Sequence, residues 1–210
     1  MRRPRIGILG GTFDPVHVGH LVAAVNVRHE LSLDQVLLVV ANQPWQKVGS
    51  RPVTPAADRL ALVRAAVAGC PGVEASDIEI ARGGMSYTAD TVAELSAAHP
   101  GAELFLVVGA DVAHLLDTWE RVDEVRRAVT LVVVNRPGSR VAPGDPAGSL
   151  AGWRVQTSEI PALEISSTEL RERAAQGRPL DFLIPPEAIR LIRERNLYRG
   201  EEMTGSSSRA

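Results

Sequence analysis

The sequence predicts an α/β protein with a Rossmann-like, doubly wound parallel sheet and a small helical portion at its C-terminal end. Three observations support this: short continuous runs of Val, Ile and Leu, helical patterns between those runs, and a glycine-rich turn after the first run. Continuous apolar runs are typical of parallel strands covered on both faces. Their alternation with helical patterns is the order of a βαβ protein, in which ligands bind at the carboxyl ends of the strands.

Each element follows from a local pattern. Four apolar runs predict buried strands, and a weaker segment predicts a short fifth one; they cover residues 5–9, 35–40, 104–108, 130–134 and 153–157. Apolar residues at helical spacing predict helices over residues 19–31, 55–68, 88–98, 167–176 and 186–195. Thr54 is a candidate N-cap with Pro55 at the first helical position, and Ser166 or Ser167 is a candidate N-cap for the fourth helix.

The length of 210 residues is that of one domain, which we expect to span residues 1–198. Residues 137–152 are rich in Gly, Pro, Ser and Ala and predict a long surface loop. Residues 199–210 have too few apolar groups to order themselves and predict a flexible tail.

Composition excludes several classes of function. The 23 basic and 25 acidic residues give a formal net charge of −2, so no basic footprint for nucleic acid is expected. No segment approaches the roughly 20 apolar residues that span a bilayer, so no membrane partner is expected. The single cysteine, Cys70, favours a reducing compartment, and the apolar N-terminal stretch is too short for a signal peptide. We therefore expect a cytoplasmic protein with small-molecule substrates, and the sequence leaves a homo-oligomer open.

The turn after the first strand has the features of a phosphate site. Gly10, Gly11 and Thr12 follow the strand, and a helix is predicted to begin near Gly19. Glycines allow close backbone approach to a ligand, and a helix N-terminus directs free N–H groups and a positive dipole end toward an anion. His17 and His20 lie three residues apart across this turn, so both imidazoles are expected to reach one phosphate chain.

Other interpretations of this turn fit less well. The glycine spacing does not match the dinucleotide fingerprint, and no Gly-Lys-Ser/Thr follows as in a P-loop. Two histidines could begin a zinc site, but no third ligand has suitable spacing, so no protein-held metal is expected.

The segment 10–20, Gly-Gly-Thr-Phe-Asp-Pro-Val-His-Val-Gly-His, resembles the signature of the HxGH nucleotidylyltransferase superfamily. The resemblance implies that ATP or CTP binds on this loop, with both histidines on the phosphates. It implies binding by backbone at Gly10, Gly11, Thr12 and Phe13.

Residues 86–91, Ser-Tyr-Thr-Ala-Asp-Thr, stand at the head of the third predicted helix. They offer an N-terminal anion or carbonyl receptor, or simply a capped helix. The segment resembles a signature of the bacterial nicotinate-nucleotide adenylyltransferases, which implies that Tyr87 and Thr88 help to hold the pyridine mononucleotide.

Two further motifs extend the resemblance. Gly109 and Asp111 end the predicted strand 104–108 and are followed by Trp119. The resemblance places the Gly-x-Asp pair in the nucleotide site and the tryptophan on the nicotinate ring; capping by Asp111 and core packing by Trp119 are the alternatives.

The last motif, at residues 165–171, reads Ile-Ser-Ser-Thr-Glu-Leu-Arg. Similar segments in the superfamily bind ATP phosphates, which implies this role for Ile165, Ser166, Ser167 and Arg171. An ordinary capped helix with an exposed arginine is the alternative.

One segment departs from the family pattern. Many relatives carry Pro-His-Lys after the second strand, whereas this chain has Pro44-Trp45-Gln46-Lys47. The lysine and its charge carry over, so Lys47 joins His17, His20 and Arg171 as expected catalytic residues, but the histidine's role has no counterpart.

Together these motifs predict transfer of AMP from ATP to nicotinate mononucleotide, giving deamido-NAD and pyrophosphate, with Mg²⁺ carried by ATP. A phosphopantetheine adenylyltransferase, a cytidylyltransferase and a non-catalytic nucleotide-sensing domain are the alternatives. A tRNA-aminoacylating enzyme shares a similar histidine pair, but the chain has no basic face for tRNA.

Overall fold

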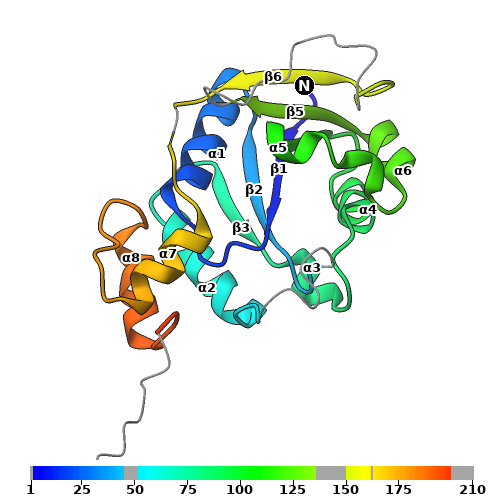
Figure 1. The fold of residues 1–210 in the computed structure, drawn as a ribbon. Helices are drawn as coiled ribbons and strands as arrows, with labels where there is room; N and C mark the ends of the chain where they lie inside the picture. The colour runs from blue at the N-terminus through cyan, green and yellow to red at the C-terminus, as the bar shows by residue number, and fades with distance from the viewer. Residues whose placement is uncertain (1, 45–51, 136–149, 162, 200–210) are drawn as a thin grey trace, which may run out of the picture.

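The computed structural model describes residues 2–44, 52–135, 150–161 and 163–199 (Figure 1). Its centre is a six-stranded sheet in the order β3-β2-β1-β4-β5-β6, and every neighbouring pair of strands is parallel. The strands are β1 (Arg5–Gly11), β2 (Gln35–Val40), β3 (Val73–Ser76), β4 (Glu103–Gly109), β5 (Val129–Asn135) and β6 (Val155–Glu159). This strand order is that of the Rossmann fold, so the predicted fold class is confirmed.

Helices cover both faces of this sheet. They are α1 (Val18–Glu30), α2 (Ala56–Val67), α3 (Ile78–Arg82), α4 (Thr88–Ala98), α5 (Ala110–Ala113), the 3₁₀ helix η2 (Leu116–Thr118), α6 (Val122–Ala128), α7 (Ser167–Ala175) and α8 (Pro186–Glu194). Residues of α1, α2, α7 and α8 share one hydrophobic cluster, and residues of α4, α5, η2 and α6 share the other. Figure 1 shows α7 and α8 at the opposite end of the molecule from α4 and α6.

Strand residues alternate between the two clusters. In β2, Val36 and Leu38 pack into the cluster with α1, whereas Leu37 and Val39 pack into the cluster with α4. Successive side chains of a strand point to opposite faces, so a strand covered on both sides must be apolar at every position. This explains why the predicted strands read as unbroken apolar runs.

The elements that the sequence did not predict are short. They are β3, α3, α5, η2 and α6, none longer than the seven residues of α6, and hydrophobic periodicity gives no clear signal over so few positions. Two boundaries also differ. Pro55, not Thr54, is the N-cap of α2, and β6 begins at Val155, because Trp153 instead lies buried beneath the guanidinium of Arg126.

The sheet opens at its centre. The ladder between β1 and β4 ends with the pair Ile8–Leu106. Beyond it, β1 continues alongside β2 as far as Gly11, and β4 continues alongside β5 as far as Gly109. The two central strands therefore part over their last residues, at the point where the strand order reverses and ligands bind in such folds.

Some predictions lie outside the described residues: most of the loop 137–152, Lys47, and the tail beyond residue 199. Within the described ranges, no helix has the length and apolar character needed to cross a membrane.

Candidate active site

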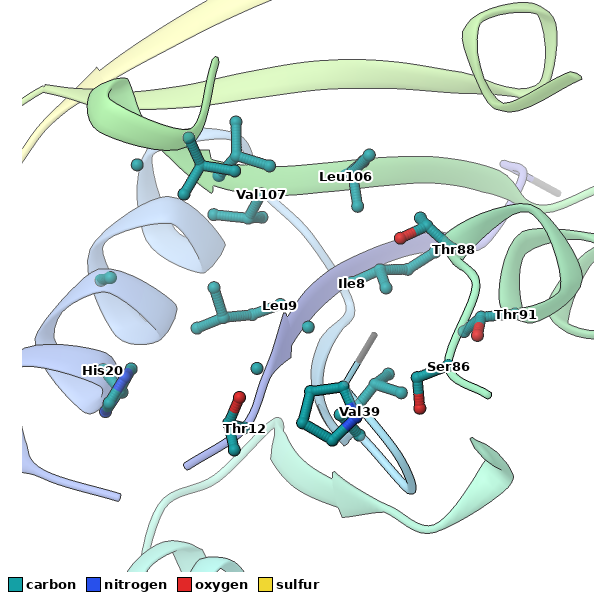
Figure 2. A pocket seen from close by; sticks show the side chains of 18 of the residues that line it. Ile8, Leu9, Thr12, His20, Val39, Ser86, Thr88, Thr91, Leu106 and Val107 are labelled. Carbon is teal, nitrogen blue, oxygen red and sulfur yellow. The ribbon is translucent and has the colours of Figure 1, made fainter. Parts of the chain in front are cut away.

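A cavity of about 310 Å³ lies where β1 and β4 part (Figure 2). Its walls come from the carboxyl ends of the central strands, the start of α1, the start of α4 and the segment around η2. Its lining includes eight of the residues expected from the sequence: Gly10, Gly11, Thr12, His20, Thr88, Gly109, Asp111 and Trp119. Figure 2 shows His20 and Thr88 on opposite sides of β1.

The two histidines stand at the start of α1, with ring centroids 3.8 Å apart. His20 lines the cavity, whereas His17 is only 5% exposed and does not line it. The backbone N–H of His17 donates to Nδ1 of His20 at 3.2 Å. A neutral imidazole whose Nδ1 accepts a hydrogen bond carries its proton on Nε2, which fixes the tautomer of His20.

Two glycines make this packing possible. A Cβ added to Gly19 would lie 3.0 Å from Nδ1 of His17, and one added to Gly11 would lie 2.9 Å from the ring of Phe13. Phe13 in turn packs edge-on against His20, with ring centroids 4.9 Å apart. A side chain at either glycine would displace an aromatic ring, so these glycines are needed to place the histidine rings as well as to let a ligand approach the backbone.

Residues 12–17, which we call the histidine loop, are held from behind by a buried arginine. Arg59 of α2 is 1% exposed and donates to the backbone carbonyls of Thr12 at 2.7 Å, Asn42 at 3.1 Å and Thr54 at 2.8 Å. A buried guanidinium requires acceptors for its donors, and these come from three separate segments. Arg59 was not predicted from the sequence; the signal that could have found it is an arginine inside the apolar pattern of a helix.

The C-terminal elements hold the same loop from another side. Arg171 donates to the carbonyl of Asp14 at 2.7 Å, and Ser167 donates to that of Pro15 at 2.9 Å. The hydroxyl of Tyr198 donates to a carboxylate oxygen of Asp14 at 3.0 Å. Burial, and then the negative charge of Asp14, raises the pKa of Tyr198 above its usual range, so this donor keeps its proton. The sequence did not single out Asp14 or Tyr198 as site residues.

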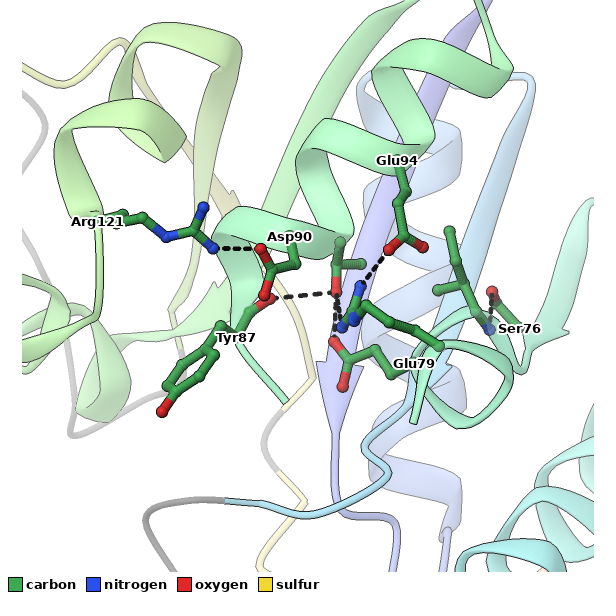
Figure 3. A network of polar contacts seen from close by, with 9 residues as sticks. Ser76, Glu79, Tyr87, Asp90, Glu94 and Arg121 are labelled. Carbon is green, nitrogen blue, oxygen red and sulfur yellow. Dashed lines mark hydrogen bonds and ion pairs between the residues drawn. The ribbon is translucent and has the colours of Figure 1, made fainter. Parts of the chain in front are cut away.

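The wall opposite His20 is built from the segment that begins α4. Tyr87 is the N-cap residue, and Thr88 is the first residue of the helix. Glu79, a buried residue of α3, lines the cavity and accepts a hydrogen bond from the hydroxyl of Thr91 at 2.6 Å (Figure 3). Arg82 donates to the same hydroxyl at 3.3 Å. Glu79 and Thr91 are polar cavity residues that were not predicted from the sequence.

Trp119 closes this side of the cavity. It directly follows η2 and packs on the cluster with α4, and its indole Nε1 is buried with no hydrogen-bond acceptor among the described residues. A buried indole N–H normally has a partner, so this one is suited to an acceptor from outside the described chain. At the end of β4, a Cβ on Gly109 would lie 2.4 Å from the carboxylate of Asp111, so the glycine lets that carboxylate fold back over the strand end.

Not every expected residue lines the cavity. His17, Phe13, Tyr87 and the motif residues Ile165, Ser166, Ser167 and Arg171 lie outside its lining. Ser166 accepts a hydrogen bond from the N–H of Glu169 as the N-cap of α7, which settles the choice between the two candidate caps. The last motif therefore joins the site by contacting the histidine loop.

The described residues contain no group of three or more His, Cys, Asp or Glu side chains placed to hold a metal ion.

The match to known families agrees with this geometry. The family model described as cytidylyltransferase-like matches residues 8–173, from β1 to α7. The chain belongs to this family of nucleotidyltransferases.

Curated relatives narrow the assignment. A probable nicotinate-nucleotide adenylyltransferase of Saccharopolyspora erythraea is 44% identical over 201 residues, 96% of this chain and 92% of the relative. One of Corynebacterium kroppenstedtii is 44% identical over 205 residues, 98% of this chain and 96% of the relative. Within its family, the chain thus belongs with the nicotinate-nucleotide adenylyltransferases, and the predicted enzyme class is confirmed.

A solved structure shares the fold. The nicotinic acid mononucleotide adenylyltransferase of Plasmodium falciparum, complexed with NaAD, superposes with a TM-score of 0.77 at 19% identity, covering 93% of this chain and 98% of that one.

Proposed function

We propose that the protein transfers AMP from ATP to nicotinate mononucleotide, giving deamido-NAD and pyrophosphate. The observation that carries this proposal is the cavity at the split between β1 and β4, with His20 on one side and Thr88 on the other. Trp119 also lines it and packs on the cluster with α4, on the side of Thr88. A site for two nucleotides needs a phosphate-binding end and an end for the acceptor ring. Family membership supports the choice of acceptor.

The histidine side is assigned to the triphosphate. His20 lines the cavity, and the start of α1 contributes the positive end of its helix dipole; the N–H groups of Val18 and His20 donate to the carbonyls of Leu183 and His17. We assign the side chains of His17, Lys47 and Arg171 to the negative charge of the triphosphate. We assign backbone groups to the same triphosphate at Gly10, Gly11, Thr12, Phe13, Ile165, Ser166 and Ser167. Gly109 and Asp111 are assigned to the adenosine.

The opposite side is assigned to the mononucleotide. The N-terminus of α4 at Tyr87 and Thr88 offers N–H donors for a carboxylate, and Trp119 offers an aromatic face for stacking. An 11-residue helix presents a useful dipole end to an anion, which suits a pyridine ring that carries a carboxylate.

The reaction is a direct displacement. A phosphate oxygen of the mononucleotide attacks the α-phosphorus of ATP; the new P–O bond forms as the bond from that phosphorus to the bridging oxygen of the β-phosphate breaks. Pyrophosphate leaves with the electron pair of the broken bond. No covalent enzyme intermediate is required, so the protein acts by aligning the two substrates and by stabilising charge on the phosphate oxygens. Mg²⁺ is part of the ATP substrate in this proposal, held on the phosphate oxygens.

We also propose a cytoplasmic location, on the strength of the single cysteine, which is free.

The test is a substrate panel. Pure protein is incubated with ATP or CTP, Mg²⁺, and nicotinate mononucleotide, nicotinamide mononucleotide or phosphopantetheine, and pyrophosphate release is measured. The proposal expects the highest kcat/KM with ATP and nicotinate mononucleotide. A preference for phosphopantetheine or CTP would replace it with one of the sister activities, and nucleotide binding without turnover would indicate a sensing domain.

A further inference from the structure

An ion pair outside the cavity connects the two segments that carry Thr88 and Trp119. The guanidinium of Arg121 donates to a carboxylate oxygen of Asp90 (Figure 3). Both side chains are partly exposed, 39% for Arg121 and 33% for Asp90. Arg121 also lies 3.5 Å from a carboxylate oxygen of Glu124 in α6.

The position of each partner in the chain gives the pair its significance. Asp90 is in the first turn of α4, two residues after Thr88. Arg121 is the N-cap of α6, two residues after Trp119. Neither Asp90 nor Arg121 lines the cavity, whereas Thr88 and Trp119 do. The pair therefore acts on any ligand only through the positions of Thr88 and Trp119.

The backbone at Arg121 adds an independent observation. Its φ of 52° and ψ of 40° are left-handed, a conformation that favours glycine. A left-handed backbone does not by itself stabilise an arginine. The residue is significant here for its side chain, which extends to Asp90 of α4.

The segment around Trp119 has few other polar ties to α4. The four-residue α5, the three-residue η2 and the turn before α6 follow one another with little regular structure. Arg126 pairs with Asp117, but this contact joins η2 to α6 and not to α4. The segment also packs on α4 through the shared apolar cluster, so the pair of Arg121 with Asp90 is the polar contact that adds direction to this packing.

We propose that Arg121 is a positioning residue for the acceptor substrate: through Asp90 it holds Trp119 at the head of α4, and so sets the affinity for the ring of the pyridine mononucleotide. This inference rests on the proposed function. It also gives the Asp of the Ser-Tyr-Thr-Ala-Asp-Thr segment a role in the site, as the anchor of the opposing wall.

Steady-state kinetics of Arg121→Gln and Arg121→Lys test the proposal. Arg121→Gln is expected to raise KM for nicotinate mononucleotide by roughly threefold to fivefold, the size of effect that a partly exposed ion pair supports, while KM for ATP and kcat stay within about twofold. Arg121→Lys keeps the charge and is expected to recover part of the loss. Arg127→Gln, which removes an exposed arginine of the same helix, is the matched control and is expected to behave as wild type.

A double-mutant cycle and salt complete the experiment. If the two side chains act through each other, Asp90→Asn combined with Arg121→Gln raises KM no further than either change alone. Added KCl is expected to raise KM for the mononucleotide more steeply in the wild type than in Arg121→Gln, because salt screens the pair.

The outcomes separate the two proposals. Wild-type protein that is inactive on nicotinate mononucleotide removes the proposed function. If the wild type is active, three results would each remove the positioning role alone. They are an unchanged KM for the mononucleotide in Arg121→Gln, an equal rise in KM for ATP, and additive effects in the double-mutant cycle.

Discussion

The two sides of the cavity are held by different kinds of interaction. The histidine loop is buried, and its carbonyls receive hydrogen bonds from Arg59, Ser167 and Arg171. The Trp119 segment packs on the apolar cluster with α4 and is tied to α4 by the ion pair of Arg121 with Asp90, whose side chains are 39% and 33% exposed. Buried hydrogen bonds from charged donors are stronger and less sensitive to salt than exposed ion pairs.

This difference matches the needs of the proposed reaction. Stabilising charge on a phosphate chain requires donors fixed before the substrate arrives, which a buried and tightly bonded loop provides. Binding the acceptor ring requires only affinity, which a weaker contact can adjust. We expect changes on the histidine side to affect turnover or folding, and changes on the tryptophan side to affect KM.

The largest effect is expected from His20→Ala. Loss of its Nε2 donor to the phosphates is expected to lower kcat by about 100-fold to 1000-fold, as for other preorganised donors, with the fold retained. His29→Ala, at an exposed histidine near the end of the same helix, is the control in pyrophosphate-release assays and circular dichroism. Near-normal turnover of His20→Ala would remove the histidine from the mechanism.

Arg59→Met is expected to act on stability. Three backbone carbonyls lose a charged donor, and the free energy of unfolding in urea is expected to fall by about 3 kcal/mol or more. The control is Arg64→Met on the same helix, which removes an exposed ion pair with Asp77, the N-cap of α3, and is expected to cost less than about 1 kcal/mol. Equal losses in the two variants would mean that the histidine loop does not depend on its buried arginine.

Trp119→Ala is expected to raise KM for the mononucleotide by roughly tenfold and to leave KM for ATP nearly unchanged, because a stacking surface is lost on one side only. Trp119→Phe keeps an aromatic face and is expected to recover most of the affinity. An effect of equal size on both substrates would contradict the division of the cavity.

The smallest effect is expected from Tyr198→Phe. Removal of its hydrogen bond to Asp14 is expected to cost about 1 kcal/mol at pH 8. Because burial raises the pKa of Tyr198 in the folded state, the unfolded chain ionises first; the stability that the protonated group contributes is present below about pH 10 and is lost as the pH rises above that value.

Urea unfolding at pH 8 and pH 10.5 measures this difference. The variant is expected to lose less stability between the two pH values than the wild type. Tyr87→Phe, at the only other tyrosine of the chain, is the matched control for removal of a tyrosine hydroxyl. A variant that loses as much stability as the wild type would show that Tyr198 does not contribute to the alkaline transition.

The sequence determined the features whose signals are local. Unbroken apolar runs predicted β1, β2, β4 and β5, because strands buried on both faces admit few polar residues. The glycines and histidines after β1 predicted a phosphate site, since glycines and a helix N-terminus form one within about ten residues of chain. The resemblance to the nicotinate-nucleotide adenylyltransferases, and not local chemistry, assigned Thr88 and Trp119 to the site, and both line the cavity.

Tertiary structure decided what holds these residues in place. Arg59 reaches Thr12 across 47 residues, Tyr198 reaches Asp14 across 184, and Arg121 reaches Asp90 across 31. No local pattern specifies such partners, because they meet only when the sheet order brings distant segments together. The sequence by itself therefore determined the fold class and the chemistry of the loop after β1, whereas packing decided that His20 faces the cavity, that His17 is buried, and which contacts support each side.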